Sequence, residues 1–243
     1  MGWEALSRWG ADAERIERLA GGVANDVWSL RVNGQLAVGR LGQRSADDLA
    51  WETGLMVHLA QNGMTVPVPI PTTDGALFAD GLVVMTYLEG VSPETADDWR
   101  RVAETLRQLH DLTRDWPQRP GWKSSTDLLT ARSGTRINLD AMPAEAVERC
   151  RAAWARLVGR PRSVVHGDPN PRNIRITADR VALIDWDEAH VDASDLDLNL
   201  PHNGANHPSD VRDLVYQASA AWEAAVCWRD AHAEAQLALV RPV

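Results

Sequence analysis

A single loop near residue 170, with the strand-like runs on either side of it, constrains the chain more than any other feature. Residues 164–165 are two valines typical of the end of a buried strand, and the loop that follows is too rich in Pro, Gly and Asn to be helix or strand. Asp168 and Asn173 stand five residues apart around this loop, and a second apolar run, residues 181–184, ends abruptly at Asp185. Strand–loop–strand geometry can turn these two carboxylates and one amide toward one point.

These three side chains have the chemistry that phosphoryl transfer requires. Carboxylate and amide oxygens hold hard cations such as Mg²⁺, and a free Asp can accept a proton from a hydroxyl group. Phosphoryl transfer uses both, because metal ions neutralise the phosphates while a carboxylate orients the nucleophile. Each residue alone could be an ordinary turn former, since Asp and Asn are common in turns. Their combination and spacing favour the catalytic interpretation.

The same stretch resembles a known family. Residues 166–168 read His-Gly-Asp, an Asn follows after four more residues, and residues 184–186 read Ile-Asp-Trp. The aminoglycoside phosphotransferase family, which shares the protein-kinase fold, carries His-Gly-Asp-x-x-x-x-Asn in its catalytic loop and Ile-Asp-Trp or Ile-Asp-Phe where protein kinases have Asp-Phe-Gly. The resemblance implies that Asp168 is the catalytic base and that Asn173 and Asp185 bind Mg²⁺. It also implies a two-lobe α+β fold and an enzyme that transfers the γ-phosphoryl group of ATP, or of GTP, to an alcohol group.

The N-terminal part of the chain predicts an antiparallel sheet with one main helix. Runs at residues 15–19, 27–32 and 36–41 are typical of strands, and Asn33-Gly34 is a strong signal for a type I′ hairpin turn. Residues 45–62 predict a helix, because the segment opens on a serine cap followed by acidic residues and closes before a glycine.

The pattern changes from strands to helices after residue 88. Residues 82–88 predict a buried strand, and another strand-like run precedes the turn at Asp80-Gly81. Three helical patterns follow, at residues 93–112, 144–158 and 209–239. We therefore predict an N-terminal nucleotide-binding lobe, residues 1–89, and a mostly helical catalytic and substrate-binding lobe, residues 90–243.

The resemblance extends to a glycine turn and a strand end in the first lobe. Gly21, Gly22 and Asn25 belong to a turn between two predicted strands, and the backbone N–H groups of such a turn can cover phosphates. In the family, the end of the last strand holds adenine, with backbone groups as donor and acceptor and a side chain behind them. The matching residues are Thr86 and Leu88 for the backbone contacts and Met85 for the pocket.

Arg40 and Glu52 are expected to form a pair. Arg40 lies on the strand where the family carries a Lys, sometimes an Arg, that contacts the nucleotide phosphates, and Lys123 is the only lysine in the chain. The guanidinium group offers a permanent charge and a planar fork of donors. Glu52 falls on the apolar face of the helix at residues 45–62, where a buried carboxylate needs a partner, and the family pairs these two positions. The alternative is a surface Arg at a strand end.

The stretch after Asp185 is acidic, and its carboxylates are Asp187, Glu188, Asp192, Asp195 and Asp197. They predict either a solvated loop or a negative rim that attracts an amine-bearing substrate. The family has an Asp near the position of Asp195 that supports the catalytic loop. By the same resemblance His110 is structural, and we expect His166 to brace the loop through hydrogen bonds.

Composition limits the partners. The formal net charge of −9 argues against sequence-independent nucleic-acid binding, which needs a basic face. The first residues lack the basic start and apolar core of a leader, and no apolar run approaches the ~20 residues of a membrane span. We therefore expect a cytoplasmic protein with no membrane partner. The two cysteines, Cys150 and Cys227, are expected to be free thiols.

The sequence leaves the acceptor of the phosphoryl group open. An aminoglycoside or related aminated antibiotic is one candidate, favoured by the acidic stretch, and a cationic small molecule is expected on the same ground. A choline-like, sugar or amino-alcohol metabolite would use the same machinery. A nucleotide-binding regulator without catalysis is the alternative from another class, and it is disfavoured because Asp168, Asn173 and Asp185 are all retained.

Overall fold

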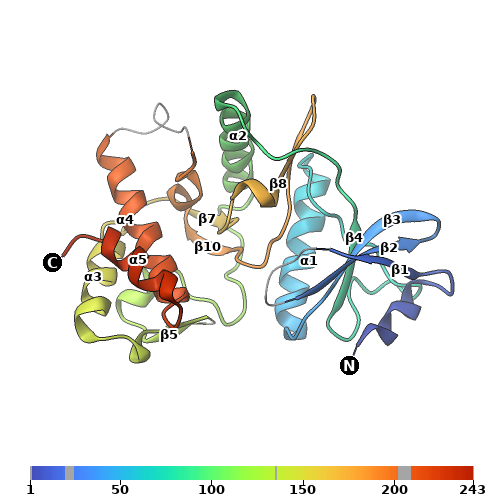
Figure 1. Cartoon of the computed structure of the whole chain (residues 1–243), viewed down its shortest axis with the longest axis horizontal. Coiled ribbons are helices and arrows are strands. Elements are labelled where there is room, and N and C mark those ends of the chain that lie inside the picture. The colour runs from blue at the N-terminus through green and yellow to red at the C-terminus, as the bar shows by residue number, and fades with distance from the viewer. Residues whose placement is uncertain (1, 20–24, 135, 202–208, 243) are drawn as a thin grey trace. The chain divides into compact units, whose positions relative to one another are not determined.

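The computed structural model describes residues 2–19, 25–134, 136–201 and 209–242. They belong to two compact units, one made of Met1–Ser92 and Ile174–Ile184 and the other of Pro93–Asn173 and Asp185–Val243 (Figure 1). The predicted α+β class is confirmed, because the first unit holds an antiparallel sheet with one main helix and the second is mostly helical.

The first unit is built on a four-stranded antiparallel sheet in the order β1-β2-β3-β4. Its strands are Glu14–Arg18 (β1), Asp26–Val32 (β2), Gln35–Leu41 (β3) and Leu82–Thr86 (β4), preceded by a 3₁₀ helix at Trp3–Trp9 (η1). Asn33 and Gly34 close the β2–β3 hairpin with φ angles of 49° and 74°, and the positive φ at both positions is that of the predicted type I′ turn. Trp9 packs with Leu30 and Leu82 in a buried cluster of this unit.

Helix α1, Ala46–Gln61, has the predicted caps. The Ser45 hydroxyl accepts a hydrogen bond from the Asp48 amide, and Gly63 adopts a φ of 84° just after the helix. A glycine there is favoured because a left-handed residue ends the helix without a Cβ penalty. The strand-like run predicted before Asp80 is not a strand, since only a single bridge joins Ala79 to Leu82.

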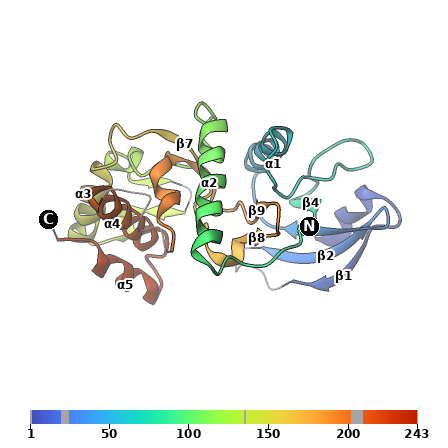
Figure 2. The same ribbon diagram turned by 90° about the horizontal axis from the view of Figure 1, so that it is seen from above.

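A short hairpin from the C-terminal half of the chain belongs to the first unit. Its strands, Ile174–Ile176 (β8) and Val181–Leu183 (β9), pair with each other in antiparallel fashion (Figure 2). Single backbone bridges join β8 to Val91 and β9 to Thr65. The first unit therefore contains two strands that the chain supplies only after passing through part of the second unit.

The second unit combines four helices with short strand pairs among the residues described. Its helices are Ala96–Leu112 (α2), Ala144–Ala155 (α3), Ser209–Val226 (α4) and Ala231–Leu239 (α5). Its strands are Ser133–Gly134 (β5), Ile137–Asn138 (β6), Arg162–Val165 (β7) and His190–Ala193 (β10), with β5 paired to β6 and β7 paired to β10. Its 3₁₀ turns are Asp127–Leu129 (η2), Leu139–Ala141 (η3), Pro171–Asn173 (η4) and Ser194–Leu198 (η5).

Two helix boundaries differ from those predicted. Helix α2 begins at Ala96 rather than at residue 93, because Thr95 and Asp98 form a capping box in which each side chain bonds the other's backbone amide. The helical pattern at residues 209–239 is two helices, because the chain turns where the Asp230 amide bonds the Cys227 carbonyl at 2.7 Å. Among the helices described, none is long and apolar enough to cross a membrane.

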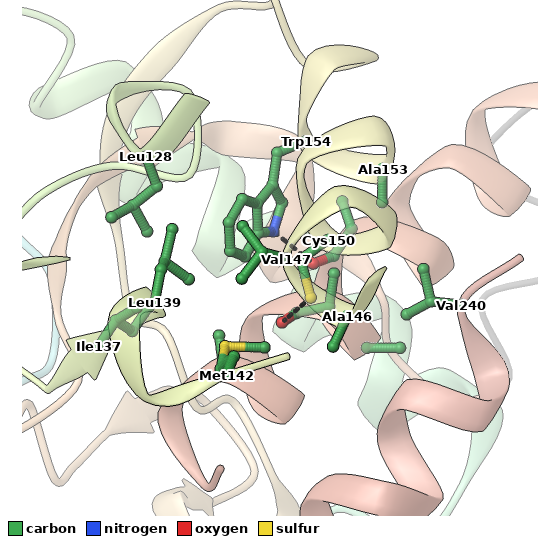
Figure 3. Packing of buried hydrophobic residues seen from close by; sticks show 14 of the residues in the cluster. Leu128, Ile137, Leu139, Met142, Ala146, Val147, Cys150, Ala153, Trp154 and Val240 are labelled. Carbon is green, nitrogen blue, oxygen red and sulfur yellow. Dashed lines mark hydrogen bonds between the residues drawn. The ribbon is translucent and has the colours of Figure 1, made fainter. Parts of the chain in front are cut away.

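The core of the second unit forms where α3 packs against α4 (Figure 3). Trp154 is fully buried, and its indole Nε1 donates a hydrogen bond to the Ala218 carbonyl at 3.3 Å. The Cys150 thiol lies one turn earlier and bonds the Ala221 carbonyl at 3.6 Å. Both cysteines are free thiols, as predicted, and burial raises the pKa of Cys150 to about 12.

Trp154→Ala tests how much this core contributes to the stability of the protein. Removing a buried indole leaves a cavity, so the free energy of unfolding should fall by about 3–5 kcal/mol. Val158→Ala is the matched control, because this side chain is 63% exposed at the end of the same segment and should change stability by less than ~0.5 kcal/mol. Urea unfolding measures both, and equal losses would contradict the assignment of Trp154 to the core.

Candidate active site

Asp168 and Asn173 lie together in the loop between β7 and β8. The Asn173 amide nitrogen, Nδ2, donates to the backbone oxygen and to the carboxylate Oδ2 of Asp168, both at 3.0 Å. These bonds place the nitrogen toward Asp168 and leave the amide oxygen of Asn173 as the atom available to a cation. Asn173 is itself buried, while Asp168 is half-buried.

The loop is held by a buried carboxylate. Asp197, on η5, accepts hydrogen bonds from the backbone amides of His166 at 2.6 Å and Gly167 at 3.0 Å, and its Oδ2 lies 3.0 Å from Nε2 of His110. Burial alone would raise the pKa of Asp197, but the hydrogen bond and charge of His110, the charge of His166 and the Gly167 amide together hold the pKa below its ordinary value. The structural role expected for His110 is therefore this contact with Asp197.

The support for the loop comes from Asp197, so the expectation that placed it at Asp195 is wrong. Asp195 forms an ion pair with Arg160 instead, at 2.7 Å. The two positions are two residues apart on a 3₁₀ turn, which directs their side chains differently. His166 contributes as expected, because its Nδ1 lies 3.4 Å from the Asp168 amide, and its ring also packs on Trp186.

Gly167 meets two separate requirements. Its φ is 85°, a conformation that residues with a Cβ rarely adopt. A Cβ added at this position would also lie only 2.5 Å from the backbone oxygen of Glu188. The segment after β9 therefore packs directly against the residue that precedes Asp168.

Asp185 begins that segment and is exposed. Its φ of 63° lies in the left-handed region, which Asp adopts more readily than most residues with a Cβ, and residues held in such conformations cluster at functional sites. Trp186 follows and is buried, so the chain turns sharply between an exposed carboxylate and a buried indole.

Arg119 fixes the backbone that follows Asp185, and sequence reasoning missed it. Its guanidinium Nη1 donates to the carbonyl oxygens of Trp186 at 3.0 Å, Asp187 at 3.0 Å and Ala189 at 2.8 Å. Arg119 is 1% exposed. Its position in a Pro-rich loop gave no signal for this role, because its partners lie about 70 residues away in the chain.

The donor set fits a divalent cation held jointly with phosphate groups. The amide oxygen of Asn173 and the carboxylate of Asp185 are hard oxygen ligands, and Mg²⁺ is often bound by one or two carboxylates with substrate phosphates and water. Within the described ranges, no group of three or more His, Cys, Asp or Glu residues could hold a metal on its own.

In the first unit, Arg40 and Glu52 form the expected ion pair. Glu52 is fully buried, and Arg44 makes a second ion pair with the same carboxylate. Arg44 also approaches Asp48 at 3.8 Å. Sequence reasoning missed Arg44, which precedes the Ser45 cap, while Asp48 and Glu52 are four residues apart on one face of α1.

The predicted adenine-binding segment is β4 and the residues after it. Met85 is buried in the sheet. The Thr86 amide donates to the Val68 carbonyl at 2.9 Å, so its single proton is already engaged and cannot also serve adenine as predicted. In the described part of the chain, no backbone hydrogen bond to another backbone group engages Leu88, which keeps both its donor and its acceptor.

The glycine turn is only partly described. Gly21 and Gly22, the predicted phosphate-covering residues of this turn, lie outside the described residues. Asn25 is described and packs its side chain against Gly42, next to the end of β3.

The acidic stretch after Asp185 is neither a solvated loop nor a continuous negative rim. Asp192 is fully buried and accepts hydrogen bonds from the amide and the hydroxyl of Ser125, both at 2.6 Å. Asp197 is buried under the loop that carries Asp168, and Glu188 is paired with Arg136. With Asp195 also paired, most of this negative charge is neutralised locally.

Gly167→Ala should destabilise the protein through both strain and overlap. We expect a loss of about 1–3 kcal/mol beyond that of Gly159→Ala, because overpacking against the Glu188 backbone adds to the cost of the positive φ. Gly159 is the matched control, since its φ is 81° and an added Cβ would meet nothing within 4 Å. Thermal or urea unfolding compares the two, and equal losses would show that the contact with Glu188 is unimportant.

Asp197→Asn should lower the free energy of unfolding at neutral pH by about 1–3 kcal/mol, because it disrupts buried hydrogen bonds to two amides. Since the folded-state pKa of Asp197 is depressed, its contribution is complete above the unfolded-state pKa of about 4 and is lost as the pH falls through the folded-state value. Urea unfolding between pH 7 and about pH 3 should show the difference from the parent protein narrowing only at the acidic end. Asp195→Asn, at a partly exposed pair, should cost less than ~1 kcal/mol.

Comparison with known proteins identifies the family. Residues 15–203 match the family described as the phosphotransferase enzyme family. A homoserine kinase of Beijerinckia indica subsp. indica is 28% identical over 200 residues, which are 75% of this chain and 62% of that protein. Among solved structures, the microcompartment-associated aminopropanol kinase superimposes with a TM-score of 0.65 at 15% identity, covering 97% of this chain and 92% of that one. Aminoglycoside phosphotransferase APH(4)-Ia gives a TM-score of 0.63 at 15% identity, covering 93% and 94%. The chain therefore belongs to the phosphotransferase enzyme family.

Proposed function

We propose that this protein is a kinase that transfers the γ-phosphoryl group of ATP to the hydroxyl of a small amino-alcohol metabolite of the homoserine class. The observation that carries the proposal is the pairing of Asp168 with Asn173 in a loop that Asp197 holds in place. A carboxylate positioned by an amide is what a hydroxyl nucleophile needs, and the remaining oxygen of that amide is what a phosphate-bound cation needs.

In this proposal Asp168 orients the acceptor hydroxyl and takes up its proton, while the hydroxyl oxygen bonds to the γ-phosphorus and the bond from that phosphorus to the bridging oxygen breaks to release ADP. Asn173 fixes the carboxylate of Asp168 through the 3.0 Å bond to Oδ2. Asn173 and Asp185 would hold Mg²⁺, which supplies positive charge to the phosphate oxygens when bound. Arg119 acts one step further away, because it fixes the backbone that follows Asp185.

The nucleotide-binding role is assigned to residues of the first unit. Arg40 would neutralise charge on the nucleotide phosphates, and Glu52 orients it through the buried ion pair. Arginine keeps its charge at any physiological pH, so this position does not need the lysine that the chain lacks there. Leu88 would bind adenine through its backbone groups, with Met85 behind it, while Gly21 and Gly22 would cover the phosphates.

The acceptor class rests on the relatives and on the charges near the catalytic loop. The curated relative named above is a homoserine kinase, although the chain spans only 62% of its length. The backbone of Glu188 packs against Gly167, and the carboxylate of Glu188 is paired with Arg136, so a residue next to the loop carries an ion pair. A small molecule carrying one ammonium and one carboxylate group suits such a pair better than a polycation does. An aminoglycoside acceptor loses its main support, because the acidic stretch is largely neutralised.

Asp168→Ala should reduce transfer by about 10²–10⁴-fold or more while nucleotide affinity stays close to that of the parent protein. The assay follows ATP consumption, and separately GTP consumption, with homoserine, small amino alcohols and aminoglycosides as acceptors. Asp140→Ala is the control, because Asp140 is an exposed carboxylate paired with Arg132. Transfer at the parent rate by the Asp168 variant would refute its role. Nucleotide binding without turnover on any acceptor would favour a non-catalytic regulator.

A further inference from the structure

A cavity in the second unit is lined by several arginines and by none of the residues assigned to catalysis. Its volume is about 470 Å³, and it is lined by one face of α2 and Arg114 just beyond it, by residues 161–162 at the start of β7 and by the first residue of η5. Three of its lining residues are arginines, Arg107, Arg114 and Arg162, and one is an acid, Asp111. The formal charge of these four side chains is therefore +2 (three minus one), in a chain whose net charge is −9.

The three arginines differ in whether a carboxylate of the protein pairs with them. Arg114 pairs with Asp111 at 2.6 Å, and Arg162 approaches Asp127 at 3.8 Å. Arg107 is half-buried, and in the part of the chain that the structure describes its side chain makes no ion pair or hydrogen bond. A partly desolvated guanidinium without a protein partner is costly unless an anion completes it.

The cavity also adjoins the support of the catalytic loop. His110 lies on the same face of α2, lines the cavity, and contacts Asp197 at 3.0 Å through Nε2. Asp197 in turn holds the amides of His166 and Gly167. Charge placed in the cavity therefore faces a histidine that directly contacts the carboxylate beneath the loop.

We propose that this cavity binds a small phosphate monoester and that its occupation alters the catalytic loop through His110 and Asp197. A phosphate monoester carries about −1.5 to −2 charges at neutral pH, which is opposite in sign to the positive charge that the lining arginines keep, chiefly at Arg107. Arginine forks bind such groups through paired N–H donors. The proposed coupling to catalysis rests on the proposed function, whose product is itself a phosphate monoester. Binding of a phosphate monoester in the cavity does not depend on that function.

Calorimetric titration with O-phosphoserine as the probe tests the site, with inorganic phosphate and citrate titrated separately. Arg107→Gln should weaken binding of O-phosphoserine by about tenfold or more, and Arg107→Lys should weaken it less, because it keeps the charge but loses the fork. Arg100→Gln is the matched control, since Arg100 is an exposed α2 arginine paired with Asp97 and Glu104. It should leave the affinity unchanged.

Equal affinity of the parent and Arg107→Gln proteins, or no binding of O-phosphoserine by the parent, would overturn the site. Binding of citrate as tightly as O-phosphoserine would overturn the assignment to phosphate monoesters. For coupling, the probe should change kcat or KM of the parent but not of Arg107→Gln, whose activity without the probe should equal that of the parent. Binding without any kinetic change in an active enzyme would overturn the coupling alone. A protein without turnover would refute the proposed function and leave the binding result to stand.

Discussion

The geometry of the loop that carries Asp168 depends on one buried carboxylate. Asp197 receives two backbone amides and a histidine in a position with almost no access to solvent. A buried carboxylate is stable only when hydrogen bonds and opposite charges replace its lost hydration. The amides of His166 and Gly167 supply part of that replacement, so the position of Asp197 and the conformation of these two residues depend on each other. Asp168 follows immediately, and its placement is a consequence of that dependence.

A second constraint acts from the opposite end of the site. Arg119 collects three carbonyl oxygens from the segment after Asp185, and Glu188 of that segment closes against Gly167. The loop that carries the candidate base and the segment that carries the candidate metal ligand are therefore packed together and tied to different supports. Such double fixation is the condition under which polar groups can be held ready for charge that develops during a reaction.

Features that depend on residues close together in the sequence could be predicted, and features that depend on residues far apart could not. The type I′ turn at Asn33, the caps of α1 and the inward face of α3 depend on neighbours a few residues apart, and all of them were predictable. The contacts of Asp197 and Arg119 join residues separated by about 30 to 90 positions, and no local pattern marks them. The resemblance pointed to a supporting carboxylate but to the wrong one, because Asp195 and Asp197 differ in direction rather than in type.

The short hairpin of β8 and β9 means that the first unit is completed only by residues from the C-terminal half of the chain. The first unit includes Ile174–Ile184, joined to it by bridges at Thr65 and Val91. During synthesis on the ribosome, the first unit therefore lacks β8 and β9 until some eighty residues of the second unit have been made. The first unit is therefore made of two separate stretches of chain, and the residues that flank the second stretch, Asn173 and Asp185, are the candidate metal ligands of the second unit.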